Sequence, residues 1–148
     1  MAVLGAALMK SQKVLIGRIE KVSFPEFKLR DVPAKVDTGS YRGTLHCHKI
    51  EEIVQNGDRR LQFVPLDPWH KHFGNHRVEV NEYKIAFVRS SSGHREMRFI
   101  VTTPIIIRRK KFDIELSLSR RHTMRYPVLL GRKFLKGRFV IDVGRRTR

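Results

Sequence analysis

The stretch that decides the fold is residues 34–40, Ala34-Lys35-Val36-Asp37-Thr38-Gly39-Ser40. An apolar strand here runs directly into Asp-Thr-Gly. Asp37 supplies a carboxylate, and Thr38 supplies a hydroxyl that can hydrogen-bond to a partner loop. Gly39 permits a backbone that aims amides at the carboxylate. The tripeptide alone also suits an ordinary turn, so its significance depends on the segments downstream of it.

A second apolar segment lies downstream, at Val128-Leu129-Leu130-Gly131-Arg132. Its apolar residues predict a strand that ends at a glycine. The pattern then predicts a short helix over Gly131–Lys136 and a last strand over Val140–Val143. A hairpin is predicted between the two apolar segments, since two alternating runs, 83–87 and 97–101, flank the turn-rich residues Ser90–His94.

The rest of the chain also favours strands. Phe112, Ile114, Leu116 and Leu118 alternate with polar residues, which is typical of a half-buried strand. Asn56-Gly57 predicts a second hairpin, between 49–54 and 60–64. Many short strands with turn signals indicate an all-β barrel or sandwich.

The order of these pieces resembles the retropepsin pattern of catalytic loop, flap hairpin, apolar-apolar-Gly strand, helix and terminal strand. The chain more closely resembles the bacterial family labelled "ATP-dependent zinc protease", whose members are retropepsin-like. The matching pieces lie between Ile16 and Asp142 and are Lys35–Gly39, Leu45-His46, Ser92–Glu96, Ile114–Leu118, Met124–Tyr126, Leu129–Arg132, Gly137–Phe139 and Val140–Asp142.

The resemblance implies a retropepsin-like (acid protease) closed β-barrel with one short C-terminal helix. It implies catalytic roles for Asp37, Thr38 and Gly39. It also implies a brace formed by Leu130, Gly131 and Arg132, in which Arg132 pairs with a carboxylate. The substrate-binding residues expected near the cleft are Arg42, Ser92, Gly93, His94, Arg95 and Arg125. After Asp-Thr-Gly the family commonly has Ala-Arg-Thr-Ser-Ala, whereas this chain has Ser40-Tyr41-Arg42-Gly43-Thr44.

An aspartic peptidase needs two carboxylates that share one proton, one to activate water and one to protonate the amide carbonyl. The chain has a single Asp-Thr-Gly. We therefore expect a homodimeric aspartic endopeptidase, in which Asp37 of each copy lies at the two-fold axis. The terminal strand near Val140 is expected to pair with its counterpart.

The sequence favours neither metal nor nucleotide chemistry. It has no His-Glu-x-x-His and no Gly-x-x-x-x-Gly-Lys-Ser/Thr. His46 and His48 alternate along a strand and share a face, with Cys47 on the other, but two ligands fall short of the three or four that zinc takes. Three more histidines, at positions 70, 72 and 76, lie in the irregular stretch 65–76. We expect no metal and no cofactor.

The charge suggests an anionic partner. Lys and Arg total 31 against 14 Asp and Glu, a net charge of +17. Together with the resemblance, which includes a member that trims glutamate tails, this charge indicates an acidic, glutamate-rich polypeptide as substrate. One alternative is a basic nucleic-acid or ribosome-binding β-barrel in which Asp-Thr-Gly is only a turn. Another is a catalytically dead peptidase fold that serves as a binding module.

The length of 148 residues suits one domain. We expect residues 1–12 to form an N-terminal arm, 13–143 the retropepsin-like domain with an insertion around 55–82, and 144–148 a basic tail. The charged run 108–111 is expected to be a solvated loop. One cysteine, no apolar span and no signal peptide favour a cytoplasmic protein without a membrane partner.

Overall fold

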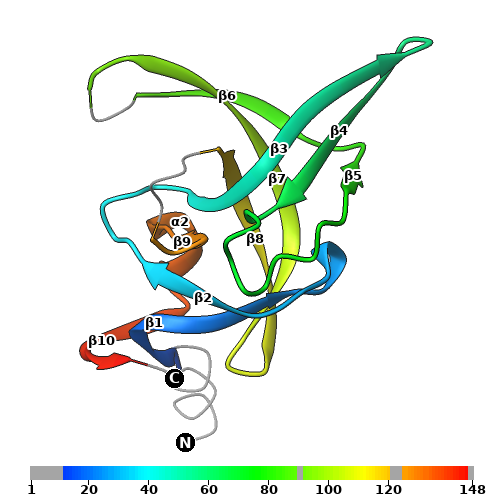
Figure 1. Cartoon of the computed structure of the whole chain (residues 1–148). Helices are drawn as coiled ribbons and strands as arrows, with labels where there is room; N and C mark the ends of the chain where they lie inside the picture. Colours follow the sequence, from blue (N-terminus) through cyan, green and yellow to red (C-terminus); the bar gives the residue numbers. More distant parts are fainter. Residues whose placement is uncertain (1–11, 90–91, 121–124, 147–148) are drawn as a thin grey trace, which may run out of the picture.

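Strands dominate the computed structural model, which describes residues 12–89, 92–120 and 125–146. The strands are β1 (Val14–Phe24), β2 (Leu29–Val36), β3 (Gly43–Gln55), β4 (Asp58–Pro65), β5 (Val78–Val80), β6 (Lys84–Arg89), β7 (Arg95–Ile107), β8 (Lys110–Ser119), β9 (Val128–Leu130) and β10 (Phe139–Arg146). A 3-10 turn, η1 (Pro25–Phe27), and one α-helix, α2 (Arg132–Leu135), complete these ranges (Figure 1). The described ranges leave out almost all of the expected N-terminal arm, two residues of the Ser90–His94 turn (the flap turn), Met124 and the last two residues.

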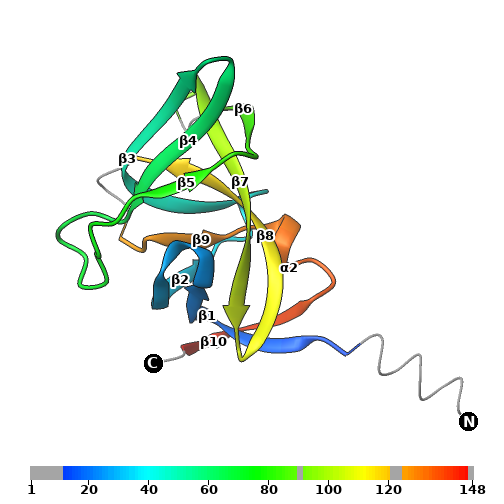
Figure 2. The same ribbon diagram turned by 90° about the vertical axis from the view of Figure 1, so that its right-hand side faces the viewer.

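Six strands close into a barrel in the order β1-β2-β9-β3-β8-β7. The ring closes because β7 returns to β1, with Val22 opposite Ile107 and Ser23 opposite Ile106. The remaining strands extend the barrel: β10 pairs with β1, β6 with β7, and β4 with β3 and β5 (Figures 1 and 2). The all-β class, the closed barrel and the single short helix near residue 131 are therefore confirmed.

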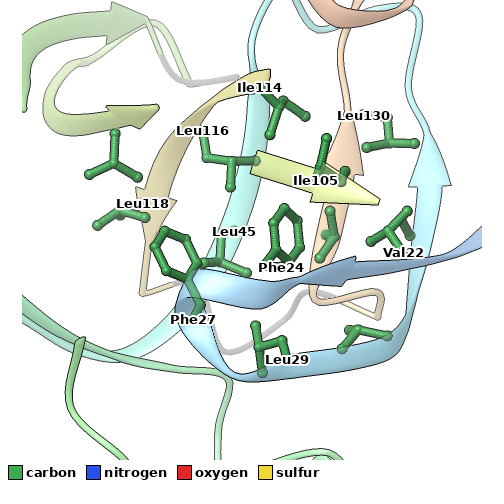
Figure 3. Packing of buried hydrophobic residues seen from close by; sticks show 14 of the residues in the cluster. Val22, Phe24, Phe27, Leu29, Leu45, Ile105, Ile114, Leu116, Leu118 and Leu130 are labelled. Carbon is green, nitrogen blue, oxygen red and sulfur yellow. The ribbon is translucent and has the colours of Figure 1, made fainter. Parts of the chain in front are cut away.

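Apolar side chains from all around the ring fill the barrel (Figure 3). On β8, Ile114, Leu116 and Leu118 point inward and are buried, as their alternation predicts. Phe24 and Phe27 stack at 5.9 Å between ring centroids, and Phe63 meets Phe27 edge-on at 5.1 Å. Each such side chain stabilises the fold by about 1.5–3 kcal/mol relative to an exposed one.

Two hairpin turns with positive φ differ in whether their sequence predicts them. Asn56 and Gly57 both have positive φ, 51° and 82°, and join β3 to β4 as their sequence predicts. Arg108 and Arg109 also have positive φ, 53° and 63°, and join β7 to β8. The expected solvated loop is thus a tight turn. It is held by an ion pair of 2.8 Å from Arg108 to the buried carboxylate of Glu20.

Within the segment 55–82, strands β4 and β5 pair with each other, and residues 66–77 between them agree with the irregular stretch expected at 65–76. The end of the chain is more regular than expected. Strand β10 continues to Arg146, so most of the expected basic tail belongs to a strand. In the described ranges, no helix is long and apolar enough to cross a membrane.

Gly131 is needed where β9 turns into α2. A Cβ atom added there would lie 2.5 Å from the carbonyl oxygen of Arg42 and 2.7 Å from that of Tyr41. Its φ of −93° suits any residue, so the constraint is space and not backbone conformation.

We predict that Gly131→Ala lowers the free energy of unfolding by about 1–3 kcal/mol or more, because a methyl group would push two backbone segments apart. The measurement is urea unfolding followed by circular dichroism. Gly144→Ala is the matched control, since its Cβ would meet Asp142 Oδ1 at an ordinary 3.4 Å and should change stability by less than about 0.5 kcal/mol. Equal stability of Gly131→Ala and the wild type would contradict the packing constraint.

Candidate active site

Asp37 is the first residue after β2, and its backbone is fixed by the neighbouring strand. Its N–H donates to the carbonyl of Leu130 at 2.9 Å, which continues the parallel pairing of β2 with β9. Because β9 also pairs with β3, the Asp37 loop is held between two strands of the closed barrel. The carboxylate is partly exposed.

Both carboxylate oxygens of Asp37 accept hydrogen bonds from its own loop. The Gly39 N–H donates to Oδ1 at 3.1 Å, and the Ser40 hydroxyl donates to Oδ2 at 2.8 Å. Gly39 therefore aims an amide at the carboxylate, as expected. These two donors fix the rotation of the carboxylate. Thr38 is exposed, so its side chain is accessible to a second chain.

The residues after β9 brace this loop. The N–H groups of Arg132 and Lys133 donate to the carbonyls of Ser40 and Tyr41 at 2.8 and 2.9 Å. The Arg132 guanidinium donates to the carbonyl of Thr38 at 2.9 Å. The prediction that Arg132 pairs with a carboxylate is therefore wrong, because its described partner is a backbone oxygen.

Asp37 opens into a hollow of about 520 Å³ between its loop and the β6–β7 hairpin. We call it the Asp37 hollow. Its lining residues are Asp37, Gly39, Ser40, Tyr41, Arg42, Thr44, Val88, Arg89, Arg98, Ser117 and Leu129. Asp37 is the one carboxylate among these described residues, and three arginines accompany it. The hollow therefore favours negatively charged groups.

Arg42 is held beside this hollow by Glu115 of β8. Its Nε lies 3.2 Å from Glu115 Oε1, while Lys133 bonds to the other oxygen and Lys84 approaches to 3.7 Å. The bond from Lys133 lowers the pKa of Glu115, burial opposes this, and Arg42 and Lys84 add to the lowering, so the carboxyl pKa is below its ordinary value. Three cations share one carboxylate, which leaves this wall of the hollow positively charged.

A family model described as "RimB-like: Retropepsin-like aspartic endopeptidase RimB" matches residues 15–148. The chain belongs to the RimB-like family. The resemblance to retropepsin-like proteins that the strand order and Asp37-Thr38-Gly39 suggested is thereby confirmed.

The chain is similar to one part of several longer proteins. A Desulfotalea psychrophila protein named "Probable alpha-L-glutamate ligase" is 33% identical over 132 residues, which are 88% of this chain and 28% of that protein. A Parasynechococcus marenigrum protein of the same name is 29% identical over 134 residues, 89% of this chain and 28% of the relative. The RimB-like chain thus spans about 28% of the length of these curated relatives.

One solved structure has a similar fold. It is the crystal structure of Lpg0085 from Legionella pneumophila, described as a protein of unknown function (DUF785). The TM-score is 0.71 at 27% identity, and the match covers 90% of this chain and 95% of that one.

The other predicted substrate-binding residues lie away from the Asp37 hollow. In the part of the chain that the structure describes, Ser92, Gly93 and His94 form an exposed turn, in which Gly93 has a φ of 85°. Arg95 lies over the ring of Phe87 at 5.0 Å, and Arg125 over the ring of Tyr126 at 5.8 Å. None of them is among the described residues that line the hollow, so their contact with substrate stays a prediction.

Sequence reasoning missed four residues of the site: Ser40, Arg89, Arg98 and Glu115. The alternation on β8 does place Glu115 outside the barrel core, but nothing in the sequence names its three partners. Arg98 lies beyond the flap turn in an alternating run, so its direction could have been read from that pattern. For Arg89, beside the turn, no comparable signal exists.

A second polar cluster lies in the barrel wall. His46 is buried on β3, and its Nε2 bonds to Asp67, which is also buried. His48 reaches the other oxygen of Asp67 at 3.0 Å, and Trp69 Nε1 donates to the carboxylate at 3.3 Å. The two histidines therefore share a face, as predicted, and they anchor the segment 66–77 to β3.

The electrostatics of this cluster result from burial and pairing. Burial raises the pKa of Asp67, but the hydrogen bond and charge of His46, with the bonds from His48 and Trp69, lower it overall. Burial holds the pKa of His70 below its ordinary value. Burial, and then the charge of Asp67, raise the pKa of the Cys47 thiol, which is therefore protonated at neutral pH. Among the described residues, no three His, Cys, Asp or Glu side chains are grouped to hold a metal.

We predict that Asp67→Asn lowers the free energy of unfolding at pH 7 by about 1–3 kcal/mol, because a neutral amide accepts the hydrogen bonds of His46, His48 and Trp69 more weakly than the buried carboxylate does. Urea unfolding followed by circular dichroism measures the loss. Glu79→Gln, which alters an exposed ion pair on β5, is the control and should cost less than about 1 kcal/mol.

Wild type and Asp67→Asn also test how the stability of the fold depends on pH. The folded pKa of Asp67 lies below its ordinary 3.8, so its contribution is present above pH 3.8 and is lost as the pH falls below that value. The stability difference between wild type and Asp67→Asn should therefore shrink below pH 3.8. His70, with a folded pKa below 6.5, should weaken both proteins as the pH falls below 6.5, and the variant more strongly, because in the wild type the charge of Asp67 opposes the lowering of the His70 pKa. A difference that stays constant down to about pH 3 would refute the role of Asp67.

Proposed function

We propose that the chain is one subunit of a homodimeric aspartic endopeptidase that cleaves acidic, glutamate-rich polypeptide. The observation that carries the proposal is the carboxylate of Asp37, oriented by Gly39 and Ser40 at the base of an open hollow in a RimB-like barrel. A carboxylate with fixed rotation and an open approach can hold and activate a water molecule.

The chemistry requires a second carboxylate, which a second copy of the chain would supply. Two like charges held close share one proton. The ionised Asp37 takes a proton from water, and the resulting hydroxide attacks the peptide carbonyl. The protonated Asp37 of the other copy donates its proton to the carbonyl oxygen. Collapse of the tetrahedral intermediate then breaks the C–N bond. The first Asp37 gives its proton to the leaving nitrogen, and the Asp37 of the other copy takes a proton back from a hydroxyl group of the intermediate.

The outer edge of the barrel offers a surface for this association. Strand β10 ends the strand order and pairs with β1 on one side. Val143, 77% exposed, lies on it together with Val140, and Leu15 of β1 is also exposed. An unpaired strand edge with exposed apolar side chains favours strand-to-strand pairing. A symmetric contact through β10 would suit the two-fold geometry.

The acidic substrate is inferred from charge and from the relatives. The net charge of +17 attracts polyanions, and Arg42, Arg89 and Arg98 line the Asp37 hollow. Guanidinium groups bind carboxylates through charge-assisted hydrogen bonds. Relatives named alpha-L-glutamate ligase contain a region similar to this chain, which supports a glutamate-rich chain as the shared substrate class.

We predict that Asp37→Asn lowers the rate of peptide cleavage by at least about 100-fold while the fold is kept, because the amide cannot act as an acid or a base. The assay is chromatography of a glutamate-rich peptide after incubation, with a chelator present and without ATP. Asp58→Asn, an exposed carboxylate in the β3–β4 hairpin, should cleave like the wild type.

Mixing wild type with Asp37→Asn tests whether two copies of the chain share one active site. An excess of Asp37→Asn added to a limiting amount of wild type should reduce the total activity, since mixed dimers carry one carboxylate. Full activity of the wild type under this excess, with exchange of subunits demonstrated, would refute the dimeric site. Undiminished cleavage by Asp37→Asn alone would refute the peptidase.

We predict that Arg42→Gln raises KM for an acidic peptide about tenfold and leaves KM for a neutral peptide nearly unchanged, because it removes one charge-assisted hydrogen bond. Salt should act in the same direction, raising KM for the acidic peptide between about 50 and 200 mM. Steady-state kinetics on the two peptides measure both effects. Equal cleavage of acidic and neutral peptides at all salt concentrations would contradict the acidic substrate and leave the peptidase intact.

A further inference from the structure

A second hollow, of about 390 Å³, lies between β3 and β7 at the end of β8. We call it the Arg120 hollow. Its lining residues are Ile50, Glu96, Met97, Arg98, Phe99, Leu118 and Arg120. Arg98 lines both this hollow and the Asp37 hollow, so the two hollows are neighbours of one residue. A chain bound at Asp37 that runs along Arg98 would reach the Arg120 hollow.

Both arginines are already positioned by the protein. Arg98 is only 14% exposed, and it donates to the Leu118 carbonyl at 3.5 Å and to Glu96 at 2.6 Å. Arg120 donates to the carbonyl of Ile50. Each guanidinium has five N–H donors, so donors remain for a ligand. Because their rotamers are held, little entropy is lost when they bind one.

The remaining walls define the chemistry of the ligand. Ile50 and Leu118 are buried apolar side chains, and Met97 is exposed at the opening. Two arginines and Glu96 leave one net positive charge. A carboxylate on a short apolar stem matches both features, since its methylenes cover the apolar wall and its charge meets a guanidinium. A phosphate of nucleic acid would carry no stem to cover the apolar wall.

We propose that the Arg120 hollow is a subsite for a glutamate side chain of the polypeptide bound across Asp37, with Arg98 and Arg120 as specificity-determining residues. This proposal rests on the proposed function. It assigns Arg120, which lines the second hollow and not the first, to residues of the substrate away from the cleaved bond. Long acidic peptides depend on it, and short ones do not.

The test is binding of fluorescent glutamate peptides to Asp37→Asn, which holds the substrate without cutting it. An extended peptide of about eight residues spans about 26 Å, whereas a dipeptide spans about 7 Å. We expect the long peptide to reach both hollows and the dipeptide to occupy one. Adding Arg120→Gln should weaken binding of the long peptide about tenfold and leave that of the dipeptide unchanged. Arg60→Gln, which removes an exposed arginine of β4 paired with Glu79, is the control of equal charge and should bind the long peptide normally.

A variant that is expected to bind more tightly separates a change in the subsite from a loss of folding. Glu96→Gln removes the carboxylate that bonds to Arg98, so the long peptide should bind about threefold more tightly. Circular dichroism confirms that each variant is folded, and Arg120→Lys, which keeps the charge, should bind between wild type and Arg120→Gln. Tighter binding by Glu96→Gln together with weaker binding by Arg120→Gln supports the subsite.

The outcomes separate the subsite from the peptidase. If Arg120→Gln weakens both peptides equally, or neither, the subsite is wrong, whatever the wild type cleaves. If the long peptide binds with the predicted dependence on Arg120 but the wild type does not cleave it, the subsite stands and the proposed catalysis fails. In the wild-type background, the subsite requires that Arg120→Gln raise KM for the long peptide and leave kcat nearly unchanged.

Discussion

The position of Asp37 depends on one close contact between backbones. The chain after β9 lies against the loop after β2, so near that a side chain at Gly131 would overlap the carbonyls of Tyr41 and Arg42. At that distance the N–H groups of α2 can reach the carbonyls of Ser40 and Tyr41. The loop is therefore fixed by main-chain bonds, which are insensitive to the identity of the exposed side chains. The position of the carboxylate therefore depends little on the side chains of Tyr41 and Arg42.

The few acidic side chains near the site are used to position cations. Glu115 holds Arg42, Lys84 and Lys133, and Glu96 holds Arg98. An ion pair of this kind contributes little stability at the surface. Its effect is to place a guanidinium at the wall of a hollow with most of its donors unused. The excess of 31 basic over 14 acidic residues then appears as positive potential around Asp37, where an acidic chain would approach.

The features predictable from sequence are those set by local pattern. Alternation identified β8, and Asn56-Gly57 identified a turn, because both depend on neighbours in the chain. Closure of the barrel through Val22 and Ile107 depends on residues far apart, and no local signal encodes it. Arg108-Arg109 was missed because a left-handed turn favours Asn or Gly. Its conformation is stabilised instead by the pair with Glu20, which only the folded barrel forms.

The same difference between local patterns and long-range contacts explains which parts of the site the sequence could predict. Asp37-Thr38-Gly39 and Leu130-Gly131 are contiguous motifs, so their meeting could be inferred from the family pattern. Partners such as Glu115 for Arg42, or Asp67 for His46, belong to strands or loops brought together by the barrel. Charge composition indicated an anionic substrate without indicating which arginines reach the hollow. Arg95 and Arg125 were favoured by their proximity to motifs, yet both lie over aromatic rings.

The use of the aromatic residues distinguishes the remaining functional alternatives. Binding of single-stranded nucleic acid requires aromatic faces open to bases. Of the nine Phe, five are buried in the core. Among the described residues, the exposed rings of Tyr41, Phe87 and Trp69 each have one face covered by the chain's own side chains, by Arg42 and Lys133, by Arg95 and by His70. Stacking of bases would have to displace these contacts. An acidic polypeptide would need no such displacement, because it would bind the outward donors of arginines that the rings and carboxylates already hold in place.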